Sequence, residues 1–272
     1  MNSRNFAIAL VLASLSSWAT TRAGAEPLET GCTIISDQSS GKIILREGDC
    51  ARRLPPASSF KVPLAAIAFD AGILKDPRTP RWTYKTEFDA PARDRKSVDP
   101  ATWLSDSVLW YSREITRRLG EGRFAEAVAR LGYGNGDVSG DPGKNNGLTH
   151  SWLSSSLQIS ADEQAAFMKR LLAGELPVSK RAMLLTQQAM PVYDGAGGWT
   201  VHGKTGSTRL RNATGGLDPT KPVGWFVGWA EKGGRKIIFV RMRVGGQKAD
   251  RFLGRMVRDQ FLKDLPNLKA LR

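Results

Sequence analysis

Ser58-Ser59-Phe60-Lys61 is the stretch of this 272-residue sequence that decides its fold, together with Lys204-Thr205-Gly206 far downstream. The first stretch offers a serine with a lysine three residues later, and on a helix this spacing places both side chains on one face. The chain holds only two histidines, so a Ser-His-Asp triad is hard to build. A lysine must then take the serine proton, which requires an ammonium made neutral by burial or by chemical modification.

An apolar helix is predicted directly after this serine, from Phe60 to Leu74. Ser58 would stand at its beginning, where unpaired backbone N–H groups and the positive end of the helix dipole favour a developing anion. Pro63 is compatible with the helix if it lies in the first turn. Ser58 is therefore the candidate nucleophile.

A hairpin is predicted before the serine, with strands at 33–35 and 43–46 and a turn at Ser39-Ser40-Gly41. The two cysteines, Cys32 and Cys50, bracket it. In an oxidising compartment we expect a disulfide that closes the hairpin, and the alternative is two separate free thiols.

The middle of the chain reads as helical. Loops are expected between about Asp76 and Asp99, and six glycines mark a long shaped loop from Gly132 to Gly147. A capping box at Ser160-Ala161-Asp162-Glu163 opens one of the helices. The predicted helices span 103–119, 124–131, 160–172 and 179–189.

Strand character returns near the C-terminus. Strands are predicted at 199–204, 223–231 and 236–244, and an amphipathic helix from Asp250 to Leu265. The Lys-Thr-Gly segment would thus end the first of these strands. Strands at both ends and helices between them predict an α+β fold, in which the N-terminal hairpin joins a central antiparallel β-sheet with flanking helices and a helical subregion.

The first residues are typical of a secretory signal. Arg4 supplies the positive start, Phe6–Leu15 a short apolar run and Ala23-Gly24-Ala25 a cleavage site. We expect a signal peptide at 1–25 and one domain at 26–272, which would be periplasmic or secreted. No later run of 18 apolar residues occurs, so no membrane insertion is expected after the signal is removed.

The net charge of +14 raises the alternative of a nucleic-acid binder. The basic residues are scattered and not interleaved with aromatics, so no nucleic-acid partner is expected. His, Cys and Asp do not cluster with metal-ligand spacing, so no metal is expected. We expect His150 and His202 to be hydrogen-bonded neighbours of other groups.

The two lysine motifs in this order indicate a penicillin-recognising serine enzyme. The usual Ser-Asp-Asn element is replaced by Ser105-Asp106-Ser107, and the glutamate stretch of class A enzymes is not found. From about Cys32 to Leu265 the chain resembles the class D, oxacillinase-type β-lactamases. The matching segments are 56–63 (PASSFKVP), 107–109 (SVL, with leucine for the usual valine), 133–135 (YGN), 152–155 (WLSS, without the usual glycine) and 204–206 (KTG).

The resemblance implies a β-lactamase and penicillin-binding transpeptidase-like fold in which Ser58 opens the β-lactam ring as an acyl-enzyme. It implies that CO2 or bicarbonate carboxylates Lys61 to N6-carboxylysine, the general base, and that no dissociable cofactor is needed. Phe60, Val108, Leu109 and Trp152 could form an apolar pocket around Lys61, which would lower its pKa and supply the free amine. Trp152 and Leu109 would stabilise the carbamate.

Further roles follow from the same resemblance. Ser107 would relay a proton to the lactam nitrogen, and the backbone N–H groups of Ser58 and Ser207 would form the oxyanion hole. Tyr133 and Asn135 would support the loop, and Trp103 would either line the cleft or pack as a helix aromatic. Residues expected to bind substrate are Lys204, Thr205, Gly206, Ser207, Thr208 and an arginine, Arg255 or Arg251, for the substrate carboxylate.

The predicted function is a secreted serine β-lactamase that confers β-lactam resistance. Its small-molecule substrates would be penicillins, with oxacillin and cephalosporins as further candidates, and the chain would be a monomer or a dimer. The alternatives are a penicillin-binding DD-peptidase and a β-lactam sensor domain, both acylated without turnover. These proteins typically carry a membrane anchor or added domains, which we do not expect here.

Overall fold

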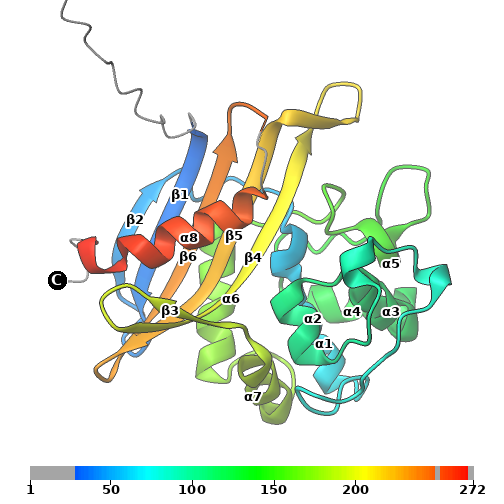
Figure 1. The fold of residues 1–272 in the computed structure, drawn as a ribbon, viewed down its shortest axis with the longest axis horizontal. Coiled ribbons are helices and arrows are strands. Elements are labelled where there is room, and N and C mark those ends of the chain that lie inside the picture. Colours follow the sequence, from blue (N-terminus) through cyan, green and yellow to red (C-terminus); the bar gives the residue numbers. More distant parts are fainter. Residues whose placement is uncertain (1–27, 249–251, 269–272) are drawn as a thin grey trace, which may run out of the picture.

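The N-terminal hairpin and the C-terminal strands pair into one antiparallel sheet, which a computed structural model of the chain describes over residues 28–248 and 252–268 (Figure 1). The strand order is β2-β1-β6-β5-β4-β3. Strand β1 runs antiparallel to β6, with Ile34 opposite Val240, so the predicted union of the two ends is confirmed. The strands are β1 (Leu28–Asp37), β2 (Ile43–Gly48), β3 (Val192–Gly195), β4 (Trp199–Arg211), β5 (Leu217–Lys232) and β6 (Arg235–Gly245).

Helices cover both faces of this sheet, which explains why residues 222–230 of β5 are all buried. Alternate residues of a strand point to opposite faces. In β5, Trp225 and Val227 lie in the apolar cluster beneath one helix, α6, whereas Phe226 and Ala230 lie in the cluster beneath another, α8. Figure 1 shows α8 crossing one face of the sheet and α6 lying behind the other.

The helical subregion lies beside the sheet, at the β4 side (Figure 1). The helices are α1 (Lys61–Asp70), α2 (Pro100–Asp106), α3 (Leu109–Leu119), α4 (Glu121–Leu131), α5 (Gly147–His150), α6 (Ala161–Ala173), α7 (Lys180–Ala189) and α8 (Leu253–Asp264). The short 3-10 turns are η1 (Ala57–Phe60), η2 (Thr86–Phe88), η3 (Ala92–Asp94) and η4 (Leu265–Asn267). The predicted capping box is present at the start of α6, where Ser160 and Glu163 bond reciprocally.

Several predicted boundaries are wrong, and the largest error concerns the helix predicted over 103–119. It is two helices, α2 and α3, because Ser107 adopts a left-handed conformation with φ 62° that ends the first. The predicted helix 60–74 ends at Asp70, ahead of Gly72 with φ 70°. Its start is the 3-10 turn η1, which contains Ser58.

The strand that carries Lys-Thr-Gly is also longer than predicted. β4 continues to Arg211, so 204–206 lie in its middle and do not end it. The short strand β3 was not predicted, although its Val192–Gly195 segment pairs with the start of β4. The last helix begins at Leu253; the predicted start at Asp250 lies outside the described residues.

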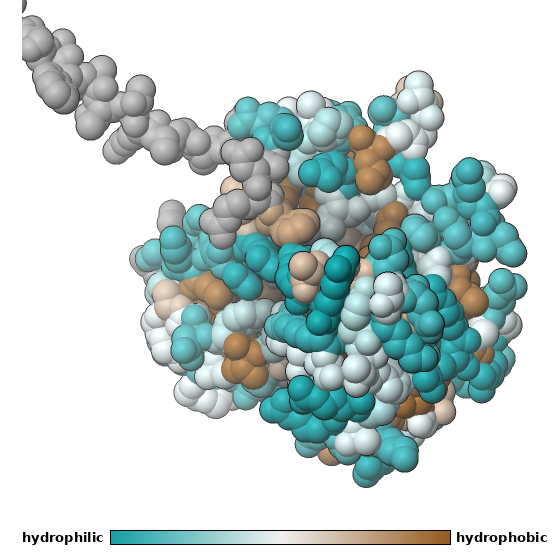
Figure 2. Space-filling model, turned by 45° about the vertical axis from the view of Figure 1, so that its right-hand side comes forward, coloured by the Kyte–Doolittle hydropathy of each residue, from teal (hydrophilic) through white to brown (hydrophobic). Residues whose placement is uncertain are grey.

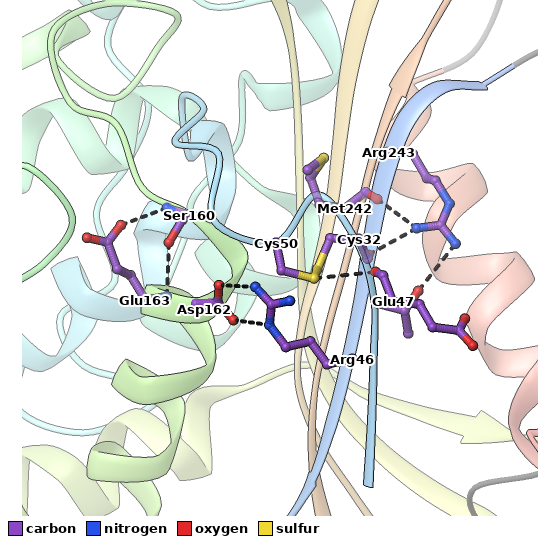
Figure 3. Close-up of a disulfide and its surroundings, with 10 residues drawn as sticks. Cys32, Arg46, Glu47, Cys50, Ser160, Asp162, Glu163, Met242 and Arg243 are labelled. Atoms are coloured by element: carbon purple, nitrogen blue, oxygen red, sulfur yellow. Dashed lines mark hydrogen bonds and ion pairs between the residues drawn. A yellow bond between two sulfur atoms is a disulfide. The ribbon is translucent and has the colours of Figure 1, made fainter. Parts of the chain in front are cut away.

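A disulfide joins Cys32 and Cys50, with their Cα atoms 5.1 Å apart, as the sequence predicted. Figure 3 shows it beside the start of α6, where Arg46 of β2 forms an ion pair with Asp162 at 2.8 Å. The Asp162 N–H also donates to the Cys50 carbonyl at 3.1 Å. The N-terminal hairpin, the segment leading to Ser58 and α6 are therefore tied together at one point.

Among the described residues, no helix combines the length and the apolar character needed to cross a bilayer. Figure 2 shows a face on which hydrophilic residues predominate and hydrophobic ones are scattered. The predicted signal peptide, 1–25, lies outside the described residues, as does Arg251.

Candidate active site

Ser58 and Lys61 face one another at the junction of η1 and α1. The Lys61 Nζ atom lies 3.4 Å from the Ser58 Oγ atom. The serine is half-buried, whereas Lys61 is only 1% exposed. The three-residue spacing therefore brings the two side chains together as expected.

Burial lowers the pKa of Lys61 to about 7, from an ordinary value of 10.5. The negative charge of Asp94 opposes this effect, and the positive charge of Arg113 adds to it. Phe60, the residue before Lys61, is buried and its ring stacks on the buried Trp152 with centroids 5.4 Å apart. A lysine in such surroundings carries a substantial neutral fraction near neutral pH, and the free amine is both a base and a nucleophile toward CO2.

A second lysine, Lys204 of β4, lies buried beside a second serine. Its Nζ donates to Ser107 Oγ at 3.1 Å and to the Thr205 carbonyl at 3.0 Å. Burial, and then the charge of Lys61, lower the pKa of Lys204. Because the charge of Lys61 is one of the causes that lower the pKa of Lys204, a positive charge on Lys61 disfavours protonation of Lys204.

Strand β4 approaches η1 closely enough that a side chain at Gly206 would not fit. A Cβ there would lie 2.6 Å from the Pro56 carbonyl oxygen and 3.0 Å from the Ser59 nitrogen. The next residue, Ser207, accepts a hydrogen bond from the Gly254 N–H at 2.9 Å, which fixes the start of α8 on the strand. Glycine in Lys-Thr-Gly thus lets the nucleophile segment and the strand meet.

These groups open into a cavity of about 230 Å³. Its lining residues are Ser58, Pro91, Arg93, Asp94, Asp106, Ser107, Leu109, Leu153, Thr205, Ser207, Phe252 and Arg255. The predicted Arg255 therefore reaches the site, and Lys61 and Lys204 lie buried behind its lining. A larger cavity, about 570 Å³, lies beyond the Trp152 loop and contains none of the reactive side chains, so we place the site in the smaller one.

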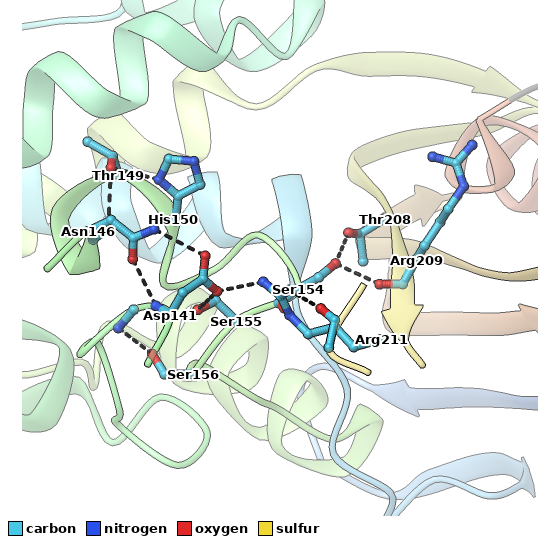
Figure 4. A network of polar contacts seen from close by, with 12 residues as sticks. Asp141, Asn146, Thr149, His150, Ser154, Ser155, Ser156, Thr208, Arg209 and Arg211 are labelled. Atoms are coloured by element: carbon cyan, nitrogen blue, oxygen red, sulfur yellow. Dashed lines mark hydrogen bonds and ion pairs between the residues drawn. The ribbon is translucent and has the colours of Figure 1, made fainter. Parts of the chain in front are cut away.

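The loop that carries Trp152 is held to β4 by a polar network (Figure 4). Ser154, with φ 56°, bonds through its hydroxyl to Thr208 and donates to the Arg209 carbonyl at 2.7 Å. Arg211 donates to the Ser154 carbonyl and pairs with Asp141. Thr208, predicted to bind substrate, therefore faces Ser154 and does not line the cavity.

The remaining predicted residues lie around the site rather than in it. Tyr133 is buried, donates from its hydroxyl to Gln164 at 3.2 Å and packs edge-on against Phe60. Asn135 donates to the Ser156 carbonyl at 2.8 Å, which braces the glycine-rich loop. Trp103 is fully buried and donates to Ser112 Oγ at 2.9 Å, so it is a packed helix aromatic and not a cleft residue.

Neither histidine lies among the residues that line the cavity. His150 is hydrogen-bonded to Thr149 and Arg113, and the His202 ring stacks on Trp229 with centroids 4.6 Å apart. In the ranges 28–248 and 252–268, no group of three or more His, Cys, Asp or Glu residues is arranged to hold a metal ion.

Sequence reasoning missed part of the cavity wall. Arg93 and Asp94 come from η3, in a stretch predicted only as loop, and Phe252 precedes α8. The Arg93 and Arg255 guanidinium carbons lie 5.4 and 5.7 Å from the centre of the Phe252 ring. The only available signal was the density of charges between Asp76 and Asp99, which solvated loops share.

Comparison with known protein families gives one match over most of the chain. The family described as "Penicillin binding protein transpeptidase domain" matches residues 31–266. Among curated proteins, the β-lactamase OXA-9 of Klebsiella pneumoniae is 50% identical over 239 residues, covering 87% of each chain. The β-lactamase OXA-1 of Escherichia coli is 35% identical over 252 residues, covering 89% of this chain and 88% of the other.

Among solved structures, the class D β-lactamase OXA-427 superposes with a TM-score of 0.81 at 41% identity. The match covers 89% of this chain and 100% of the other. The two curated relatives and the superposed structure are thus all β-lactamases, which agrees with the serines that line the cavity.

Proposed function

The chain belongs to the class D β-lactamases, and we therefore propose that it hydrolyses penicillins through a Ser58 acyl-enzyme with carboxylated Lys61 as the general base. The observation that carries this proposal is the position of a buried lysine with a pKa of about 7 at 3.4 Å from the serine hydroxyl. The family assignment makes the protein a serine β-lactamase of the kind that confers β-lactam resistance.

The surroundings of Lys61 fit the modification. Carboxylation by CO2 requires a neutral amine, which burial supplies. Phe60 and Trp152 shield the site from water, and the Trp152 indole can donate a hydrogen bond. When present, the carbamate supplies an anionic base with a proton affinity suited to a serine hydroxyl.

Acylation begins with attack of Ser58 Oγ on the lactam carbonyl carbon as its proton passes to the Lys61 side chain. The lactam C–N bond breaks, and the nitrogen takes a proton through Ser107, whose hydroxyl already accepts from Lys204. The backbone N–H groups of Ser58 and Ser207 are proposed to stabilise the carbonyl oxyanion, an effect of roughly 3–4 kcal/mol. In deacylation the same base activates water against the ester.

Binding of the substrate carboxylate falls to the β4 wall of the cavity. Thr205 and Ser207 line it, and Arg255 supplies a permanent positive charge. Lys204 is buried behind this wall, where it donates to Ser107 and to the Thr205 carbonyl, so we assign it to holding these two residues in place at the carboxylate site. Because Thr208 bonds to Ser154, we assign it to the support of the loop.

We further propose that residues 1–25 are a signal peptide and that the domain, 26–272, acts in the periplasm or outside the cell. The N-terminal sequence pattern supports this, and so does the Cys32–Cys50 disulfide, since disulfides persist in oxidising compartments.

Turnover of a chromogenic cephalosporin, with and without bicarbonate, tests the mechanism. We expect multiple turnovers that slow when CO2 is removed and recover when bicarbonate is added. Lys61→Ala should stall at or before the acyl-enzyme, whereas near-normal turnover by this variant would contradict the base assignment. A single stoichiometric acylation of the wild type would instead favour the sensor or DD-peptidase alternative.

A further inference from the structure

Asp94 is a buried carboxylate at the active-site cavity to which the mechanism assigns no role. Its side chain is 6% exposed, and it lines the same cavity as Ser58. Within the described ranges, neither of its carboxylate oxygens accepts a hydrogen bond. The Arg93 Nε atom lies 3.5 Å from Oδ1, but the Arg93 side chain is 53% exposed and shared with solvent.

Because the Asp94 carboxylate borders the cavity and accepts no hydrogen bond there, its oxygens are available to a ligand that enters the cavity. Asp94 is also held in place. Its N–H donates to the Pro91 carbonyl at 2.8 Å, and its own carbonyl accepts from the Trp110 indole at 2.8 Å. Its charge acts on the reacting centre, since it raises the proton affinity of Lys61. The carboxylate is therefore a fixed, preorganised anion that faces the cavity.

We propose that Asp94 forms a subsite for a cationic group on the acyl side chain of the β-lactam, such as the α-ammonium of an aminopenicillin. This inference rests on the proposed function. The substrate carboxylate is assigned to the wall formed by Thr205 and Arg255. In a penicillin the acylamino group lies on the opposite side of the lactam carbonyl from that carboxylate, and we place it against the η3 residue Asp94.

The other acidic residue of the cavity is a poorer candidate. Asp106 is exposed and already forms an ion pair with Lys96. A positive group that displaces water from Asp94 gains more, because the interaction is screened less where the carboxylate is buried.

Three penicillins that differ only in the charge on one side-chain carbon test the subsite: benzylpenicillin, its α-amino derivative ampicillin and its α-carboxy derivative carbenicillin. In the wild type we expect kcat/KM to decrease in the order ampicillin, benzylpenicillin, carbenicillin. Asp94→Asn should lower the ampicillin-to-benzylpenicillin ratio about tenfold, which corresponds to about 1.4 kcal/mol, and should raise the carbenicillin ratio. Asp106→Asn is the matched control and should leave both ratios unchanged.

An unchanged ampicillin ratio in a folded Asp94→Asn enzyme would overturn the subsite. A preference for carbenicillin that disappears in Arg93→Gln would also overturn it, because the η3 wall would then select anions. If Asp94→Asn does not fold, a wild-type ratio of ampicillin to benzylpenicillin at or below one overturns the subsite. If no penicillin is turned over, the rates of Ser58 acylation followed by mass spectrometry give the same comparison, so failure of hydrolysis is distinguished from failure of the subsite.

Discussion

Lys61 joins two properties that oppose each other in water: it is an amine in contact with a hydroxyl, and it is largely uncharged. Burial lowers its pKa from 10.5 to about 7, while Asp94 counteracts and Arg113 assists. Between these two pKa values the unfolded state binds more protons than the folded state. The unmodified lysine therefore makes the free energy of unfolding increase as pH rises from about 7 toward 10.5, and its destabilising contribution is complete below pH 7.

The same pKa predicts how reactivation depends on pH. After removal of CO2, the rate of recovery at a fixed concentration of dissolved CO2 should follow the neutral fraction of Lys61. It should rise about tenfold from about pH 6 to about pH 8 and then level off. Stopped-flow recovery of cephalosporin turnover, with CO2 rather than bicarbonate held constant, measures it. A midpoint near the ordinary lysine value of 10.5 would mean that the amine is exposed to water in solution.

Ser107 has two separate roles, one through its backbone conformation and one through its side-chain hydroxyl. Its φ of 62° ends α2, and its hydroxyl accepts from Lys204. Glycine adopts this conformation more readily than alanine, so Ser107→Gly should be more stable than Ser107→Ala by about 1 kcal/mol. Both lose the hydroxyl and should lose kcat to a similar extent. Urea denaturation and penicillin turnover measure the two effects, and retained turnover in Ser107→Gly would remove the hydroxyl from the mechanism.

At the scale of elements, the sequence predicted most of what forms locally. The hairpin, the capping box at Ser160 and the apolar strands of the sheet carry short-range signals, and these elements were located correctly. The break at Ser107 was missed because a non-glycine residue in a left-handed conformation leaves no mark in an apolar pattern. Strand β3 was missed because its four residues gain their structure from pairing with β4.

The residues of the candidate site likewise fall into those that the sequence predicted and those that it did not. Ser58, Lys61, Ser107 and Lys204 belong to recognisable motifs, and the structure brings them together. Asp94 and Arg93 stand in a charged loop, and their position at the cavity depends on how η3 folds back over α2 and α3. That placement is a tertiary effect which local patterns do not contain.

The polar network that holds the Trp152 loop to β4 connects two structural elements. Ser154 is buried, and its hydroxyl bonds to Thr208 and to the Arg209 carbonyl. Ser154→Ala removes these bonds and leaves buried partners unsatisfied, so the free energy of unfolding should fall by about 1–3 kcal/mol. Because Trp152 stacks on Phe60, the residue before Lys61, a looser loop should also raise the bicarbonate concentration for half-maximal activity. Denaturation and bicarbonate titration test both effects, with Ser105→Ala, an exposed hydroxyl, as control. Loss of stability with an unchanged bicarbonate requirement would show that these hydrogen bonds do not influence the carboxylation of Lys61.

For the whole molecule, the Cys32–Cys50 disulfide links the N-terminal hairpin to the chain that leads to Ser58. It closes a loop with a sequence separation of 18, and a loop of this size stabilises a protein by about 3 kcal/mol through its effect on the unfolded chain. The Cys32→Ala/Cys50→Ala double variant should therefore unfold at a lower urea concentration and melt about 6–12 °C below the wild type. Reductant should destabilise the wild type by a similar amount and leave the double variant unchanged, which separates loss of the cross-link from loss of sulfur packing. If the double variant and the wild type melted together, the ion pair between Arg46 and Asp162 and the pairing of β1 with β6 would be sufficient to hold this edge of the sheet.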